Sequence, residues 1–139
     1  MNKNVMVSLL GEHVSEEGGL PIEVTTTGEY YFEDGMHCIK YDEIAEEEGQ
    51  VTTILLKAGT EAVEMIRSGF TNAQMFFALG EPHVTSYELP FGILNMTTNT
   101  TDITVDANDD EINIDIKYEL SMNDEHVSDN TMKIRVTNV

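Results

Sequence analysis

The segment from residue 111 to residue 122 alternates polar and apolar side chains without interruption. It reads Glu-Ile-Asn-Ile-Asp-Ile-Lys-Tyr-Glu-Leu-Ser-Met. A period of two is typical of a β-strand that has one buried face and one face in water. The alternation therefore predicts a strand whose interior face carries Ile112, Ile114, Ile116, Tyr118 and Leu120.

Weaker copies of this pattern recur along most of the chain and are separated by turn residues. Together they give about ten strand segments and little or no helix. Residues 71–79 fit both helical and strand spacing, and the strands around them favour a strand. The other expected strands cover residues 5–10, 20–32, 36–41, 51–57, 61–68, 83–89 and 93–105. A turn at Asn123-Asp124 then leads into a final run in which Met132, Ile134 and Val136 alternate.

Turn chemistry supports this division of the chain. Asp34 and Gly35 lie between two alternating runs and predict a tight hairpin of type I′, since both residues tolerate positive φ angles. The acidic segment 42–49 predicts a loop, because an isolated helix of this length is marginal in water. The Thr-rich strand 93–105 is expected to bend near residues 99–102.

Short strands at regular spacing are typical of a sandwich or a barrel. A barrel is favoured because closure leaves no sheet edge unprotected. The length of 139 residues suits one domain, covering residues 1–139, with one hydrophobic core. The sequence thus predicts an all-β, single antiparallel barrel of about 8–10 strands, whose interior is filled by side chains or holds one small ligand.

The chain is strongly acidic, with 7 Lys and Arg against 26 Asp and Glu and a formal net charge of -19. Nucleic acid and membrane surfaces are not expected partners, because both attract basic proteins. The acidity either serves solubility or docks a basic protein partner. No run of about 18 apolar residues could span a membrane, and the single Cys38 fits a reducing compartment, so a cytoplasmic location is expected.

Arg67 is the first candidate for a functional role. It shares the more apolar face of its expected strand with Val63 and Met65. This parity directs Arg67 inward, where a guanidinium must be paired and hydrogen-bonded. One interpretation is a structural ion pair at the rim of the barrel, with the aliphatic stem along the wall. The other is an anchor for the carboxylate or phosphate of a ligand.

The five tyrosines are the second candidate group. They serve either as core and cross-strand partners or as hydroxyl donors to a ligand in the lumen. Tyr118 lies on the apolar face of the clearest strand and is the one most expected to point inward. The candidate ligand-binding residues are Arg67, Asn72, Tyr87 and Tyr118.

Metal and catalytic motifs do not emerge from the sequence. The four histidines lie far apart, so a zinc site would require long-range assembly. Residues 106–110 begin like a calcium loop but lack the glycine and glutamate that an EF-hand requires, and they predict a hairpin turn instead. No nucleophile turn such as Gly-x-Ser-x-Gly occurs. We therefore expect no metal, no cofactor and no catalytic residues.

A set of residues spread over most of the chain carries a family resemblance. They are Tyr30, Tyr31, Ile66, Arg67, Ser68, Gly69, Asn72, Met75, Phe77, Gly80, Tyr87, Pro90, Phe91, Gly92, Ile93, Leu94, Tyr118, Glu119 and Leu120. With them the chain resembles the YwiB-like family, small bacterial cytosolic proteins of unassigned function. The resemblance implies a calycin-like antiparallel barrel, similar in architecture to lipocalins. It brings no known active site and so bears on fold more than on function.

Three functions are consistent with such a barrel. The first is binding of a small apolar or anionic ligand in the lumen, oriented by Arg67 and tyrosines. The second is a non-catalytic interaction protein whose acidic outer face docks a basic partner. The third, and least favoured, is an enzyme that holds a substrate carboxylate on Arg67 and uses a nearby Tyr or Glu as an acid.

Overall fold

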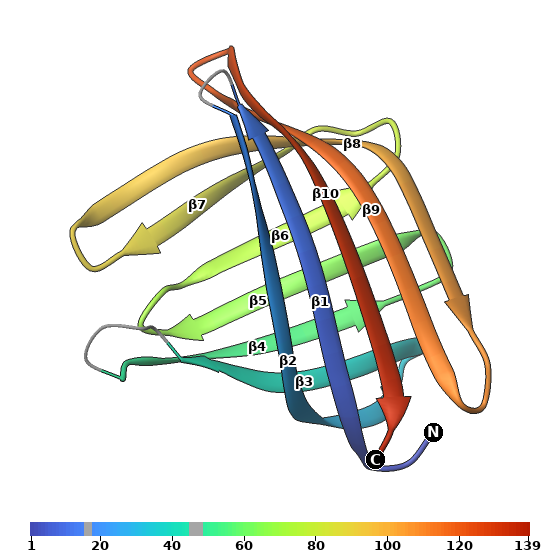
Figure 1. The fold of residues 1–139 in the computed structure, drawn as a ribbon. Helices are drawn as coiled ribbons and strands as arrows, with labels where there is room; N and C mark the ends of the chain where they lie inside the picture. Colours follow the sequence, from blue (N-terminus) through green and yellow to red (C-terminus); the bar gives the residue numbers. More distant parts are fainter. Residues whose placement is uncertain (16–17, 45–48) are drawn as a thin grey trace.

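The computed structural model describes residues 1–15, 18–44 and 49–139, which form ten antiparallel strands in one sheet (Figure 1). These residues contain no helix, and hence none with the length and apolarity of a membrane span. The strands are β1 (Asn4–Ser15), β2 (Gly18–Glu33), β3 (Met36–Ile44), β4 (Val51–Ala58), β5 (Ala62–Gly69), β6 (Ala73–Ala78), β7 (His83–Leu89), β8 (Gly92–Ala107), β9 (Glu111–Met122) and β10 (Glu125–Asn138).

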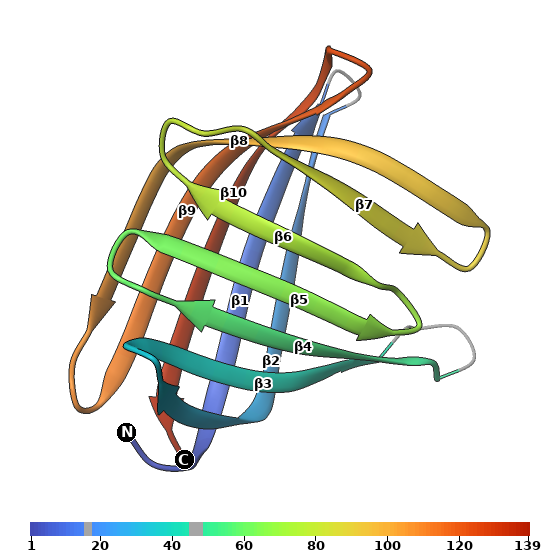
Figure 2. The same ribbon diagram turned by 180° about the vertical axis from the view of Figure 1, so that it is seen from behind.

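The sheet turns over on itself so that two groups of strands cross. In Figure 1 the steep strands β1, β2, β9 and β10 lie in front of the gently inclined β3, β4, β5 and β6, and Figure 2 shows them from behind. Residues 18–29 of β2 pair with β1, whereas residues 29–33 pair with β3. β8 is shared between β7 and β9 in the same way. These two strands, of 16 residues each, are the corners of the barrel.

The barrel is nearly closed between its edge strands β6 and β7. Asn72 and Glu88 exchange two backbone hydrogen bonds, of 3.0 and 2.8 Å, across this seam. The hydroxyl of Thr85 on β7 donates to the carbonyl of Gln74 on β6 at 3.2 Å. A few individual hydrogen bonds therefore join the β6 and β7 edges, in place of a continuous β-ladder. The predicted all-β antiparallel barrel is confirmed.

The half of the barrel near the chain termini is filled by apolar side chains. Ile112, Ile114 and Ile116 of β9 are 0–1% exposed, so the alternation of this strand correctly identified its inner face. They pack with inward residues of the other strands in one core. Its other members include Val5, Val7, Ile39, Ile54, Leu56, Val63, Phe77, Ile134 and Val136.

Local predictions from turn residues and patterning hold at three places. Asp34 and Gly35 both have positive φ angles, 53° and 77°, as a type I′ hairpin turn requires. β8 has a register shift between Thr100 and Asp102, where its bend was expected. The ambiguous segment 71–79 contains strand β6.

Several strand boundaries differ from the sequence prediction, and two of them differ by three residues or more. β1 extends to Ser15, beyond the expected end at residue 10, because it pairs with β10 up to Val14 and with β2 up to Ser15. The turn expected at Asn123-Asp124 lies directly before β10, which starts at Glu125. The prediction of a loop from residue 42 is wrong for residues 42–44, which continue β3. They pair with residues 51–53 of β4, and this ladder offsets their weak strand propensity. Residues 45–48 of the expected loop lie outside the described residues.

Candidate functional site

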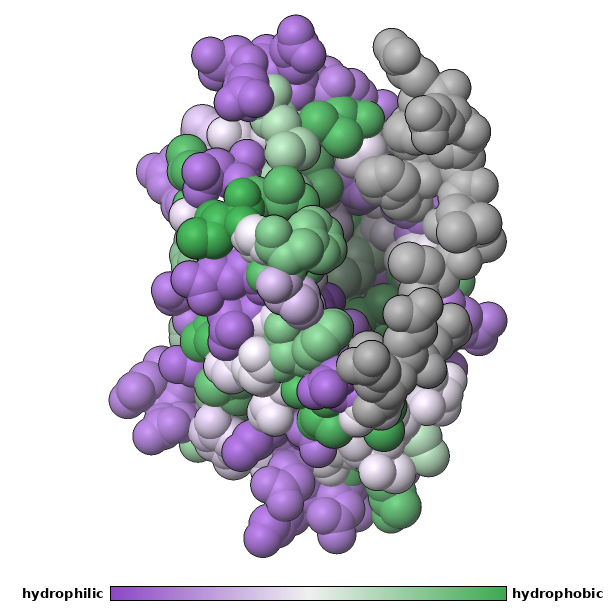
Figure 3. Space-filling model, turned by 90° about the vertical axis from the view of Figure 1, so that its left-hand side faces the viewer, coloured by the Kyte–Doolittle hydropathy of each residue, from purple (hydrophilic) through white to green (hydrophobic). Residues whose placement is uncertain are grey.

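The other half of the barrel encloses a cavity of about 620 Å³. Small-molecule sites usually measure about 300–1,000 Å³. Figure 3 shows a hollow on this side of the molecule, with hydrophobic surface visible inside it. Every strand except β4 contributes to the lining, which comprises Val7, Leu9, Gly11, Glu12, Val24, Thr26, Tyr41, Glu43, Ile44, Met65, Arg67, Met75, Phe77, Tyr87, Met96, Tyr118, Leu120, Asn130, Thr131 and Met132. The interior thus combines the two expected alternatives, a filled half and a hollow half.

Arg67 lies in the cavity wall near the end of β5, on the same face as the buried Val63 and Met65. Its inward direction agrees with the parity of the sequence, and its side chain is 18% exposed. Nη1 donates to Oε1 and Oε2 of Glu43 on β3, at 3.2 and 3.3 Å. The guanidinium carbon lies 5.9 Å from the centre of the Tyr87 ring on β7. An ion pair and an aromatic face therefore hold the guanidinium at the wall.

Three tyrosines line the cavity with Arg67. Tyr41 lies two residues before Glu43 on β3 and therefore shares its inward face. Tyr118 on β9 packs edge-on against Phe77, with ring centres 5.0 Å apart. The structure thus brings together Arg67, Tyr87 and Tyr118 from the candidate residues, and adds Tyr41 and Glu43 to them.

Burial and charge fix the protonation of these groups. Burial raises the pKa of Tyr41 to about 12, although the nearby charge of Arg67 opposes this rise. Burial likewise raises the pKa of Tyr118. For Arg67, burial lowers the pKa, but Tyr87 and Glu43 raise it, and the net result lies above the ordinary value. At neutral pH the wall therefore presents neutral phenols, which can donate hydrogen bonds, beside one permanent positive charge.

Methionines make up much of the apolar wall. Met65, Met75, Met96 and Met132 all line the cavity, and the chain has 8 methionines. Methionine is unbranched and polarizable, so it adapts to irregular shapes. None of these methionines is among the residues that the sequence predicts for ligand binding. Strand parity marks Met65 and Met132 as inward-facing, but it does not distinguish a filled interior from a hollow one.

Glu43 is the other residue that the sequence analysis missed. It falls in the acidic segment 42–49, which was expected to be a loop. The sequence does contain a signal for the inward direction of Glu43. Ile39, Tyr41 and Glu43 are spaced two residues apart on β3 and therefore lie on the same face of the strand. The partner on β5 depends on the register between strands, which a sequence does not display.

Asn72 does not line the cavity. Its side-chain oxygen accepts from the backbone N–H of Gly69 at 3.1 Å, and its amide nitrogen donates to the Gly69 carbonyl, also at 3.1 Å. Its own backbone bridges to Glu88, the residue after Tyr87. Asn72 therefore shapes the turn between β5 and β6 and holds β7, the strand that carries Tyr87, against the barrel.

One group of potential metal ligands occurs among the described residues, at the β9–β10 hairpin. Glu119, His126 and Asp129 have ligand atoms within 4.8 Å of one another. His126 Nε2 already lies 2.9 Å from Asp129 Oδ1, and both side chains are more than half exposed. Exposed acidic groups are common without an ion, so the expectation of no metal stays a prediction.

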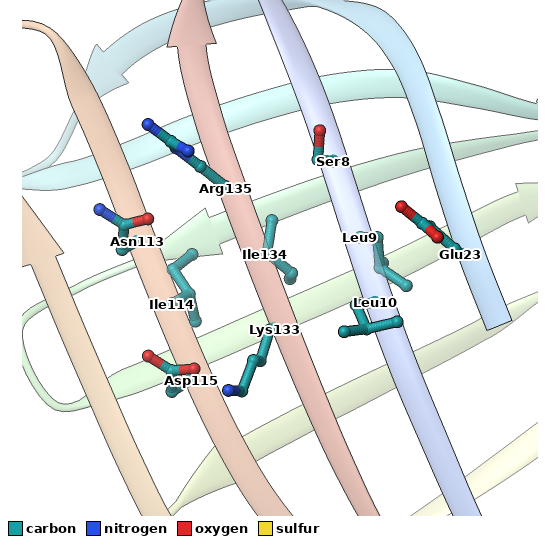
Figure 4. Close-up of a pocket in the computed structure, with 10 residues that line it drawn as sticks. All are labelled: Ser8, Leu9, Leu10, Glu23, Asn113, Ile114, Asp115, Lys133, Ile134 and Arg135. Carbon is teal, nitrogen blue, oxygen red and sulfur yellow. The ribbon is translucent and has the colours of Figure 1, made fainter. Parts of the chain in front are cut away.

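A second depression, of about 250 Å³, lies on the outside of the barrel over β1, β2, β9 and β10 (Figure 4). Its polar side chains include Glu23, Asp115, Lys133 and Arg135, all exposed. Arg135 donates from Nε and Nη2 to Oε2 of Glu111, at 3.1 and 2.8 Å. Charges on this wet outer face are screened by water and salt, unlike those of the internal cavity.

Comparison with known proteins places the chain among β-barrels of unknown function. Residues 7–134 match the domain of unknown function DUF1934. The chain belongs to the DUF1934 family. A relative, the uncharacterized β-barrel protein YwiB of Bacillus subtilis (strain 168), is 30% identical over 127 residues, which are 90% of this chain and 88% of that protein. The crystal structure of the ywiB protein from Bacillus subtilis matches this DUF1934 fold with a TM-score of 0.88 at 22% identity, over 99% of this chain and 92% of that one. The YwiB-like resemblance is thereby confirmed.

Proposed function

We propose that this protein binds a small, partly apolar ligand inside the barrel, with Arg67 and the adjacent tyrosines holding the polar end of the ligand. The supporting observation is the cavity of about 620 Å³ with a guanidinium in its wall. Mostly apolar pockets with a few converging polar groups are the usual form of small-molecule sites. A barrel without a binding role would be more stable if side chains filled this space, since protein interiors are close-packed.

The state of the phenols favours binding over catalysis. A general acid or base works best when its pKa lies near the working pH. The pKa of Tyr41 is about 12, so this phenol keeps its proton at neutral pH. Glu43, the carboxylate that Arg67 contacts, is engaged in the ion pair. These groups are suited to donating hydrogen bonds and balancing charge.

We also infer that the protein works in the cytoplasm. The support is Cys38, a free thiol that is buried on β3 and only 2% exposed. Unpaired cysteines of this kind suit a reducing compartment. Fractionation of the native cells with an antibody against the chain would check the location, and recovery outside the cytoplasm would contradict it.

Narrowing the cavity tests the binding function. In the double variant Met96→Trp/Leu120→Trp, two indoles replace cavity-lining side chains on the neighbouring strands β8 and β9. We expect native mass spectrometry of wild-type protein from its own cells to show a co-purifying small molecule. The double variant should retain at least about tenfold less of it, because overpacking removes the space that the ligand needs.

A matched control places the same two indoles outside the barrel. Val84 and Ile93 are 75% and 62% exposed on β7 and β8, so Val84→Trp/Ile93→Trp leaves the cavity unchanged. This variant should keep the ligand at the wild-type level. A ligand retained equally by both double variants, or the absence of any ligand from the wild type, would contradict a binding site in the cavity.

A further inference from the structure

The two arginines of the chain both pair with glutamate, but they use different edges of the guanidinium. On the outer surface, Arg135 donates from Nε and Nη2 to Glu111. In the cavity, Arg67 donates to Glu43 from Nη1 alone, at the longer distances of 3.2 and 3.3 Å. The Nε–Nη2 edge of a guanidinium suits the two oxygens of a carboxylate. In Arg135 this edge is bound by Glu111, whereas in Arg67 Glu43 does not bind it.

The open edge of Arg67 includes a buried donor. Within the part of the chain that the structure describes, Arg67 Nε is fully shielded from solvent and has no hydrogen-bond partner. Buried donors in native proteins nearly always have a partner, and an exception calls for an explanation. An acceptor can reach Nε only when the side chains that shield it move, and a ligand group in the adjoining cavity would then supply the missing acceptor.

The surroundings of Arg67 are suited to an anionic head group. Tyr41, Tyr87 and Tyr118 line the same cavity as Arg67. Tyr41 and Tyr118 are held neutral, so their hydroxyls keep the proton that they would donate. The ring of Tyr87 supports the guanidinium from one side, independently of Glu43.

Glu43 is placed so that it can leave the guanidinium. Its side chain is 45% exposed, whereas that of Arg67 is 18% exposed. Partly exposed ion pairs contribute little to stability, because water solvates the freed carboxylate. A competing carboxylate that also brings an apolar tail into the cavity would therefore displace Glu43 at little cost.

We propose that the ligand is an apolar monocarboxylate whose carboxylate binds the Nε–Nη2 edge of Arg67, the edge that Glu43 leaves open, and that Glu43 gives up its bond to Nη1 when this second carboxylate arrives. This inference rests on the proposed binding function and specifies its ligand class. The tail lies along the methionine-lined wall, and the tyrosine hydroxyls donate to the carboxylate. Glu43 turns to solvent when the ligand binds, because two carboxylates on one guanidinium repel each other.

Calorimetric titration tests the proposal with three probes that share a ten-carbon chain and differ in the head group. The probes are decanoate, decanamide and decyl phosphate. Wild-type protein should bind decanoate more tightly than the other two. Arg67→Gln should weaken decanoate binding by about tenfold to a hundredfold, the effect of losing hydrogen bonds to a charged group. Glu43→Gln should strengthen it by roughly twofold to fivefold, because the internal competitor is removed.

The outer ion pair provides matched controls. Arg135→Gln and Glu111→Gln make the same changes of charge outside the cavity and should leave decanoate binding unchanged. If Arg67→Gln does not fold, the gain in Glu43→Gln decides the question. Three outcomes would contradict a carboxylate ligand but not a ligand-binding cavity. They are equal binding of decanoate and decanamide, tighter binding of decyl phosphate, and no gain in decanoate affinity in Glu43→Gln. If no probe binds and no small molecule co-purifies, the proposed function fails as well.

Discussion

Arg67 and Arg135 carry the same guanidinium and differ in what surrounds it. Arg135 is a surface residue with a 63% exposed side chain, and water limits what its ion pair can contribute. Arg67 lies in the wall of a cavity, where burial raises the pKa of the neighbouring Tyr41 and Tyr118. The phenol of Tyr41, which is 5% exposed, is the residue in which this effect is largest.

The raised pKa of Tyr41 predicts a loss of stability at alkaline pH. The pKa is about 12 in the folded protein against 10.0 ordinarily. Between these values the unfolded chain releases the phenolic proton while the folded chain retains it, so the free energy of unfolding falls as pH rises. This stabilisation is complete below pH 10, and about 1.4 kcal/mol of it is lost by pH 11.

Urea unfolding of wild type and Tyr41→Phe at about pH 9 and about pH 11 measures this loss. Other titrating groups change equally in both proteins, so the difference between them isolates Tyr41. Wild type should lose about 1.4 kcal/mol more than the variant over this interval. Equal losses would show that the phenol ionises in the folded protein as it does in the unfolded chain.

The corner strands decide the shape of the barrel. β2 leaves β1 and joins β3 around residues 28–29, and the strands come unusually close there. A Cβ atom added at Gly28 would lie 2.7 Å from the Lys40 carbonyl oxygen and 3.3 Å from side-chain atoms of Tyr41 and Val7. The corner therefore requires a residue without a side chain.

Gly28→Ala should lower the free energy of unfolding by about 1–3 kcal/mol, because the backbone must move to relieve the overlap. Gly11→Ala is the matched control. It lies in β1, and an added Cβ there would meet its nearest atoms at 3.9 Å, an ordinary contact. Chemical denaturation of both variants measures the difference. Equal stabilities would mean that the corner tolerates a side chain.

At the scale of the whole molecule, the net charge of -19 opposes compaction. The charge is carried largely by the outer faces of the strands, while the inner faces supply the core and the cavity. This separation keeps most like charges in water, where salt screens them. Docking of a basic partner on the acidic surface rests on charge alone and stays a prediction.

Self-repulsion predicts that stability depends on salt. Lowering the ionic strength from about 0.15 M to about 0.01 M lengthens the Debye length from about 8 Å to about 30 Å. The thermal unfolding midpoint should then fall by roughly 5 °C. The triple variant Glu61→Gln/Glu81→Gln/Glu125→Gln, at exposed positions, should show a smaller fall. A midpoint that is independent of salt would contradict the repulsion.

Much of the fold could be predicted because its signals are local. Alternation identified the inner face of β9, and the Asp34-Gly35 pair located its hairpin. Parity also gave the inward direction of Arg67. Asn72 could not be assigned in this way, because its role depends on the backbone of Gly69 and Glu88 around it.

The amino-acid sequence is sufficient to predict the all-β class, the inner and outer faces of the clearest strands and the acidic charge of the surface. These follow from the period of two and from composition, which are properties of neighbouring residues. Tertiary structure alone decided that half of the barrel is hollow and that Glu43 meets Arg67. The reason is physical, because a cavity and an ion pair between β3 and β5 depend on strand register and on the curvature of the closed sheet.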